Sequence, residues 1–301
     1  MSVSNLSPTA NTASNPRVPT EPGPVRRVVR LAQNNELAFW GGVVFVLIAL
    51  ATAAAPLLTS YDPTKIDIPS RLLGPSLTHP FGTDEFGRDL LARVLYGGRP
   101  VLITGVLSVV VGMLIGSAIG IVSGFRGGRV DDFLMRLMDI MLSFPAILLA
   151  ILIVAALGAG LVNTIIAIAF SMIPIFARLA RSVVLVLALE QYVLASRSIG
   201  ATDRWIVLRH IVPNLIPPII VQATAMLAIA ISYSAALSFI GLGVEPPTPD
   251  WGLMVSEGQR LIFDAPHVPF FPGIAITLTV LCVNYLGDGL RDHLDPTMRN
   301  R

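Results

Sequence analysis

Few residues of this 301-residue chain have the type and spacing that chemistry requires. The four histidines (His79, His210, His267 and His293) occur at no metal-ligand spacing, and the chain contains neither HExxH nor GxxxxGK[ST]. The single cysteine, Cys282, lies in an apolar run, and a lone cysteine excludes an intrachain disulfide. We therefore expect no catalytic residue, no metal site and no nucleotide-binding loop in this chain.

The composition instead indicates a membrane protein. Hydrophobic residues make up 53% of the chain and charged residues 13%, and the mean hydropathy is +0.73. This leaves too little polar surface to cover a water-soluble globule. The net charge is only +2 and the basic residues are scattered, so no nucleic-acid partner is indicated.

Six stretches are long and apolar enough, or nearly so, to cross about 30 Å of hydrocarbon as helices of roughly 20 residues. They are approximately residues 38–58, 101–123, 138–158, 161–177, 217–240 and 271–287. Lipid offers the backbone no hydrogen-bond partner, and the alternation of a membrane β-barrel is absent. The fold class we expect is an all-α integral membrane protein with six transmembrane helices.

The ends of the chain indicate how these helices are oriented. Residues 1–36 are rich in Pro, Ser, Thr and Asn and are expected to be a disordered tail. A signal peptide is the alternative, but the apolar run Ala38–Leu58 is too long for one, and more spans follow it. Fifteen Lys and Arg residues fall on the side of both termini and six on the other, which predicts that both termini are cytoplasmic.

The membrane core of the predicted spans contains no Asp, Glu, Lys, Arg or His; Asp139 and Asp288 lie near the cytoplasmic boundaries. A secondary transporter driven by protons or sodium usually keeps an ionisable residue at the membrane midplane, so this alternative is disfavoured. Pro145 and Pro174 lie within the third and fourth spans and are expected to kink them.

The second span carries a small residue at every fourth position, a ridge that lets helix backbones approach closely. The ridge predicts either a contact between subunits or packing within the chain, and the second is the simpler. Its members are Ser108, Gly112, Gly116, Gly120 and Gly124.

The segment between the fourth and fifth spans, residues 178–216, is too long and too apolar for an ordinary linker. Helical periodicity lies on both sides of Gly200, with Thr202 placed to cap a second helix and Pro213 to end it. We expect two short helices that form a knob, with part of its apolar surface covered by another protein, because Trp205 and Ile199 are costly to leave in water.

The spacing of Ala195-Ser196, Gly200 and Val212-Pro213 resembles the EAA loop of permeases in ATP-binding-cassette importers. Leu194 stands where that pattern usually has Glu, Ser196 replaces its second Ala, and His210 takes the place of an Ile. In that family a short coupling helix in this loop docks on the ATPase subunit.

Longer segments resemble the C-type permease of dipeptide, oligopeptide and nickel importers, a resemblance that covers about residues 37–297. They are HPFGTDEFGRDLLARVLYGGR (79–99), SFPAILLAI (143–151), RHIVPNLIPP (209–218), ALSFIGLGVEPPTPDWGLM (236–254) and LGDGLRDHLDP (286–296). The resemblance implies a type I importer permease-like bundle in the bacterial cytoplasmic (inner) membrane, with residues 37–297 as the permease domain. Peptides are the expected cargo, and nickel or another small solute is the alternative.

The resemblance also implies partners: a homologous second permease in a heterodimer, two ATP-binding subunits that hold ATP and Mg, an extracytoplasmic peptide-binding protein, and membrane lipid. No cofactor is expected on this chain. The expected ATPase-coupling residues are Glu190, Leu194, Ala195, Ser196, Gly200, Ala201, Thr202, Asp203, Arg204, Trp205 and Pro213.

On the other side of the membrane, residues 83–96 are expected to form an amphipathic surface helix. Thr83 is placed to cap it, and the pairs Asp84/Arg88 and Asp89/Arg93 are four residues apart. The proline-rich loop 241–271 is expected to be rigid and could meet the binding protein. Residues expected to face that protein are Asp84, Glu85, Arg88, Pro247 and Trp251.

Overall fold

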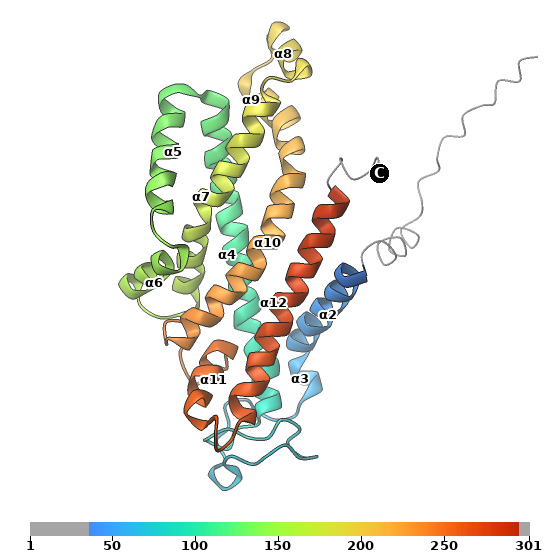
Figure 1. The fold of residues 1–301 in the computed structure, drawn as a ribbon, viewed down its shortest axis with the longest axis vertical. Coiled ribbons are helices and arrows are strands. Elements are labelled where there is room, and N and C mark those ends of the chain that lie inside the picture. Colours follow the sequence, from blue (N-terminus) through green and yellow to red (C-terminus); the bar gives the residue numbers. More distant parts are fainter. Residues whose placement is uncertain (1–35, 295–301) are drawn as a thin grey trace, which may run out of the picture.

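The computed structural model describes residues 36–294, and all named elements in that range are helices (Figure 1). Four long helices, α4, α7, α10 and α12, run side by side along the long axis, with α2 beside α12 and the α5–α6 pair beside α7. Their bounds are α2 Glu36–Ala53, α3 Ala55–Leu58, α4 Leu90–Arg126, α5 Gly128–Leu142, α6 Ala146–Leu157, α7 Leu161–Leu187, α8 Gln191–Ser198, α9 Asp203–Ile206, α10 Val212–Phe239, α11 Trp251–Gly258 and α12 His267–Leu294. Three short turns, η1 Ile68–Ser70, η2 Val207–Ile211 and η3 Gln259–Leu261, complete the described elements.

Five helical runs among the described residues are long and apolar enough to cross a membrane: α2, α4, α7, the continuous run Asp203–Phe239 and α12. The expected third span, 138–158, is not one helix. Its residues belong to α5 and α6, which meet at an angle of 88° and would make a sixth crossing only as a broken pair. Pro145 is the residue before α6 and has no N–H to continue a helix, so it separates two helices where a kink was expected.

The glycine ridge of α4 packs within the chain, against the backbone of α7. A Cβ on Gly112 would lie 3.0 Å from the carbonyl oxygen of Ala169, and one on Gly116 would lie 2.5 Å from that of Ile173. Because only glycine leaves this space empty, α4 and α7 touch backbone to backbone along three turns and more. The intrachain alternative for the ridge is therefore confirmed. Pro174, in contrast to Pro145, lies inside the unbroken α7.

Both α7 and α10 extend beyond the predicted apolar runs. The expected fourth span ended at 177, but α7 continues to Leu187, so only the shorter segment 190–211 leaves the bundle. Pro213 was expected to end a helix. It lies instead in the first turn of α10, where its missing N–H costs least, and the π-helical turn η2 joins α9 to α10 without a break.

The two ends of the bundle differ in construction (Figure 1). One end carries α8 and α9, and the start of α2 and the end of α12 point toward it. The opposite end holds α11 and the loop that precedes α4. Both described ends of the chain thus lie on one side of the bundle, as an even number of crossings requires.

The amphipathic helix expected over residues 83–96 is absent. Gly87 has φ +74°, which helical residues do not adopt, and the helix α4 begins only at Leu90. Asp89 caps it by accepting a hydrogen bond from the N–H of Ala92, while Thr83 is fully buried in the preceding loop. The loop 241–271, expected to be extended, contains the helix α11.

Candidate functional site

We call residues 190–211 the knob. It consists of α8, a tight turn, α9 and the π-helical turn η2, and it projects from one end of the bundle (Figure 1). Its interior is apolar: Val193, Ile206 and Ile211 are fully buried against Val184 of α7. The knob is therefore a folded unit anchored on α7, with a core of its own.

The turn between α8 and α9 follows from two residues. Gly200 has φ +83°, a backbone conformation that favours glycine, and its N–H donates to the carbonyl of Arg197. The Thr202 hydroxyl accepts a hydrogen bond from the N–H of Trp205 at 3.4 Å and so caps α9, as its position in the sequence predicts. The expected pair of short helices is confirmed.

Two residues that depart from the usual loop pattern contact each other. The Ser196 hydroxyl lies 3.2 Å from Nε2 of His210, and Ser196 also donates to the carbonyl of Tyr192. The His210 ring lies 5.4 Å from the ring of Tyr192 and 5.0 Å from that of Trp205, between centroids. These contacts of Tyr192 and His210 were not predicted from the sequence, although the paired departures at Ser196 and His210 were a signal for them.

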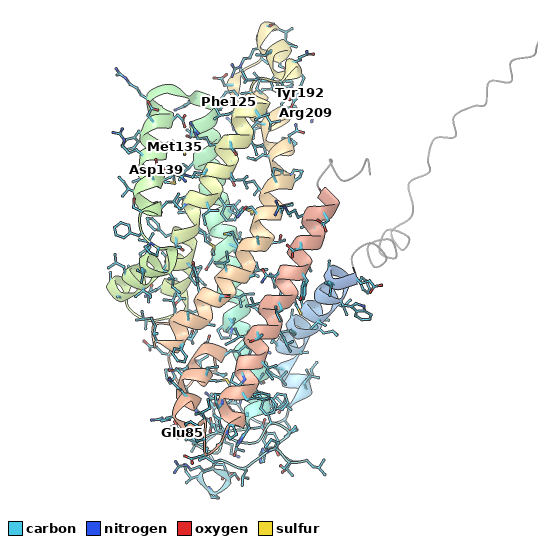
Figure 2. All side chains as sticks on the ribbon, in the orientation of Figure 1. Glu85, Phe125, Met135, Asp139, Tyr192 and Arg209 are labelled. Atoms are coloured by element: carbon cyan, nitrogen blue, oxygen red, sulfur yellow. The ribbon has the colours of Figure 1, made fainter. Side chains whose placement is uncertain are left out.

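Four large apolar side chains of the knob are exposed. Ile199 is 84% exposed, and Leu208, Trp205 and Leu194 are also exposed. We call these four side chains the apolar crown. Of the other expected coupling residues, Glu190, Ala195, Asp203, Arg204 and Pro213 are exposed, while Ala201 is partly buried and Ser196 is buried. Figure 2 shows Tyr192 and Arg209 at this end of the molecule and Glu85 at the other.

At the opposite end, four charged side chains form a buried cluster. Nε of Arg88 lies 2.6 Å from Oδ2 of Asp84, and Nε of Arg93 lies 3.4 Å from the same oxygen. Both guanidinium groups also reach Oε2 of Glu257 on α11, at 3.4 and 3.3 Å. The predicted Asp84/Arg88 pair thus exists, whereas Arg93 pairs with Asp84 and Glu257 and not with Asp89. The cluster ties the loop before α4 to α11.

Three of the five residues that were expected to face a binding protein are buried. Asp84 and Arg88 are about 95% buried in the cluster, and Trp251 is 1% exposed, with Nε1 donating to the carbonyl of Val94 at 2.7 Å. These three side chains stabilise the chain internally and offer no surface to a partner. Pro247 is exposed, and Glu85 is partly exposed beside Arg260, which it pairs with at 2.8 Å.

Asp250 is a second buried acid at this end. Its Oδ1 accepts hydrogen bonds from the N–H groups of Gly252 and Leu253, which caps α11. Burial raises the pKa of this carboxyl to about 6 despite those two hydrogen bonds. The residue was not singled out from the sequence, although an Asp before an apolar helical run is a capping signal.

No group of three or more His, Cys, Asp and Glu side chains that could hold a metal ion occurs within residues 36–294. The candidate site is the exposed surface of the knob, with Pro247 and Glu85 as the expected contact residues that remain at least partly exposed at the opposite end.

Comparison with known proteins identifies the bundle. Residues 112–300 match the family described as binding-protein-dependent transport system inner membrane component, and residues 23–75 match the N-terminal transmembrane domain of oligopeptide transport permease C. The chain belongs to this permease family. It is a multi-pass inner-membrane protein and a permease subunit of an ATP-binding-cassette importer, as the resemblance in the sequence implies.

Several relatives align over nearly their whole length. The dipeptide transport system permease protein DppC of Alkalihalophilus pseudofirmus is 44% identical, over 93% of this chain and 92% of the relative. The probable D,D-dipeptide transport system permease protein DdpC of Escherichia coli is 44% identical over 90% and 91%. The glutathione transport system permease protein GsiD of Pectobacterium atrosepticum is 44% identical over 85% and 86%.

The architecture is also shared with a solved permease. A chain of the MetNI methionine ABC transporter in an inward-facing conformation matches with a TM-score of 0.56 at 20% identity, over 68% of this chain and 98% of that one. This likeness supports the fold, a type I importer permease bundle.

Proposed function

We propose that this permease moves dipeptides or oligopeptides across the cytoplasmic membrane by alternating access, driven by separate ATPase subunits that dock on the knob. ATP and Mg are held by those subunits, because the sequence has no phosphate-binding loop. A homologous second permease completes the membrane core, and an extracytoplasmic binding protein delivers the peptide. Both termini lie in the cytoplasm, on the side of the knob.

The observation that carries this proposal is the apolar crown. Ile199, Trp205 and Leu208 are exposed, on a unit that already has its own buried core. Without a partner protein they would contact water. Several large apolar groups exposed on one small folded projection are typical of a protein interface. Because α8 and α9 rest on α7 and continue into α10, movement of a docked ATPase would be transmitted directly to two membrane helices.

The peptide cargo has a separate basis. The relatives reported above are named for dipeptides and glutathione, and their alignments cover most of this chain. Uptake of a labelled dipeptide by proteoliposomes that contain the whole complex tests the cargo. Uptake of nickel in place of peptide would support the alternative small solute.

Docking is tested by co-purification of the ATPase with tagged permease, normalised to inserted permease. Ile199→Asp and Trp205→Ala should each leave insertion unchanged and reduce bound ATPase at least about fivefold, since losing a central apolar contact costs about 1–2 kcal/mol. Phe263→Asp is the matched control, because Phe263 is 95% exposed at the opposite end. Normal ATPase retention by both knob variants would contradict docking on the crown.

The turn gives a second test. Gly200→Val should distort the knob, because a branched side chain is strained at φ +83°, whereas Gly200→Asn should retain most docking because Asn tolerates this conformation. No atom lies within 4 Å of a Cβ at this position, so the difference between the variants reports backbone conformation and not crowding. Equal loss in both variants would mean that a partner surface approaches the glycine closely.

A further inference from the structure

A polar groove of about 620 Å³ lies between α7, α10 and α12, toward the knob end of the bundle. Its polar lining comes from two helices: Asn214 and Gln222 on α10, and Asn284, Asp288 and Arg291 on α12. The groove is unlike the apolar groove between α2 and α12, which Phe39, Val46 and other hydrocarbon side chains line. Two neighbouring faces of α12 therefore meet different surroundings.

Two of the lining amides lie within the membrane-crossing runs. Gln222 belongs to the run Asp203–Phe239, and Asn284 to α12. Asn284 is exposed and Gln222 is half-buried, and neither side chain makes a hydrogen bond to another described residue. Hydrocarbon would leave these amides unsatisfied at a cost of several kcal/mol each, so lipid is not the environment that fits them.

The polar face of α12 is confined to the end of the helix nearer the knob. Asn284, Asp288 and Arg291 are separated by four and three residues, which at 100° per residue places them within about 60° of one another, and all three are exposed. Leu281 is exposed on the same side one turn earlier, and Leu278 and Ile274 are exposed as well. The end of α12 thus suits water on this side, and the turns before it suit hydrocarbon.

We propose that this groove is a wall of the water-filled path that the peptide takes, on the knob side of the membrane, with Asp288 and Arg291 receiving the two charged ends of a short peptide. The inference rests on the proposed function and deepens it by naming the residues that meet the cargo. It explains why an importer chain without charges in its membrane core carries an acid and a base together at the end of one polar face.

The chemistry of the groove matches a zwitterionic peptide. Side chains three apart on a helix have Cβ atoms about 5–6 Å apart, and the ends of an extended dipeptide are at most about 7 Å apart. No ion pair involving Asp288 or Arg291 occurs among the described residues, so each is available to an ammonium or a carboxylate group. The amides of Gln222 and Asn284 can each donate to and accept from a peptide bond. The volume lies within the range of small-molecule sites.

Cysteine accessibility in the assembled complex tests the path. In a Cys282→Ser background, Asn284→Cys and Gln222→Cys should react with a membrane-impermeant thiol reagent in inside-out vesicles, and a saturating dipeptide should slow the reaction. Leu278→Cys is the control on the same helix. It should not react measurably, because a charged, membrane-impermeant reagent does not enter hydrocarbon.

Two results would overturn the inference. Reaction at position 284 in the isolated permease but not in the complex would show that the second permease covers this face. Reaction only with a lipid-soluble reagent would show that the face meets lipid. Either result would leave the proposed function intact provided that the variant complexes still import peptide and retain their ATPase, and these are measured on the same vesicles.

Uptake kinetics test the two charges. Asp288→Asn and Arg291→Gln should each reduce dipeptide uptake at least about fivefold, as expected when one charged contact to a ligand is lost. Asp139→Asn is the charge control, because Asp139 is an exposed acid on α5, away from the groove. Unchanged uptake in both groove variants, at equal insertion and equal ATPase retention, would contradict the assignment of these residues.

Discussion

The two ends of this permease differ in the kinds of side chain that they bury and expose. At the end formed by α11 and the loop before α4, charged side chains are buried and paired within the chain: Arg93 is 1% exposed and contacts Asp84 and Glu257. At the knob, apolar side chains are left in the open, with Ile199 84% exposed. The first end also exposes large apolar side chains, Leu77 and Phe263 among them, but its charged groups are paired within the chain. At the knob the exposed apolar side chains belong to a unit that has its own small core, and this is where we propose that the ATPase docks.

The charge cluster gives the largest expected effect. Arg93→Met should lower the stability of the permease by about 3 kcal/mol, because Arg88 alone is then left to pair with the buried Asp84 and the partly buried Glu257. Arg260→Met should cost at most about 1 kcal/mol, since the Arg260 side chain is 70% exposed and, among the described residues, pairs only with Glu85. Thermal unfolding of both variants in detergent measures the contrast. Equal stability losses would mean that the buried cluster contributes no more to stability than the ion pair at the surface.

The contact between α4 and α7 connects the two ends of the bundle. A substitution in this contact should have an intermediate effect on stability. Gly120→Ala should destabilise by about 1–3 kcal/mol, because the new Cβ would lie 2.6 Å from Cβ of Ala180 and against the backbone of α7. Gly273→Ala, on α12 with no atom within 4 Å of its Cβ, should be neutral or stabilising. A neutral Gly120→Ala variant would show that the two helices are free to separate.

Asp250 has the smallest expected effect on stability. The raised pKa of its carboxyl decides whether stability rises or falls with pH. An acid whose pKa is about 6 when folded and near 3.9 when unfolded holds more protons in the folded chain between those values. Stability is therefore highest below the lower value and falls as pH rises through 6, by about 1 kcal/mol between pH 5 and 7. Asp250→Asn should remove this part of the pH dependence in thermal unfolding while keeping the cap. An unchanged pH profile would mean that water reaches the carboxylate.

The sequence was sufficient to predict the elements whose causes are local. The turn at Gly200, the cap at Thr202 and the apolar runs are determined by neighbouring residues, and the structure has the turn, the cap and five of the six runs as single helices. The glycine ridge on α4 was also visible, but its partner helix was not, because nothing in the α7 sequence repeats with the same period. Backbone contacts of this kind appear only when the fold is known.

The failures come from tertiary constraints on local signals. Pro145 and Pro174 are the same residue in similar apolar runs, yet one separates α5 from α6 and the other is buried inside α7. The spacing of residues 83–96 suits a helix, but Gly87 turns the chain so that Asp84 can meet Arg93 and Glu257. The four-residue spacing revealed the Asp84–Arg88 pair, but it could not reveal the additional partner, Glu257 on α11.

Hydrogen exchange of the permease alone and in the assembled complex tests the comparison of the two ends most directly. Assembly with the ATPase subunits should slow exchange in residues 190–211, because the crown becomes covered, and should leave residues 83–95 unchanged, because their contacts lie within the chain. Unchanged exchange in the knob on assembly would contradict the central claim that the ATPase docks there.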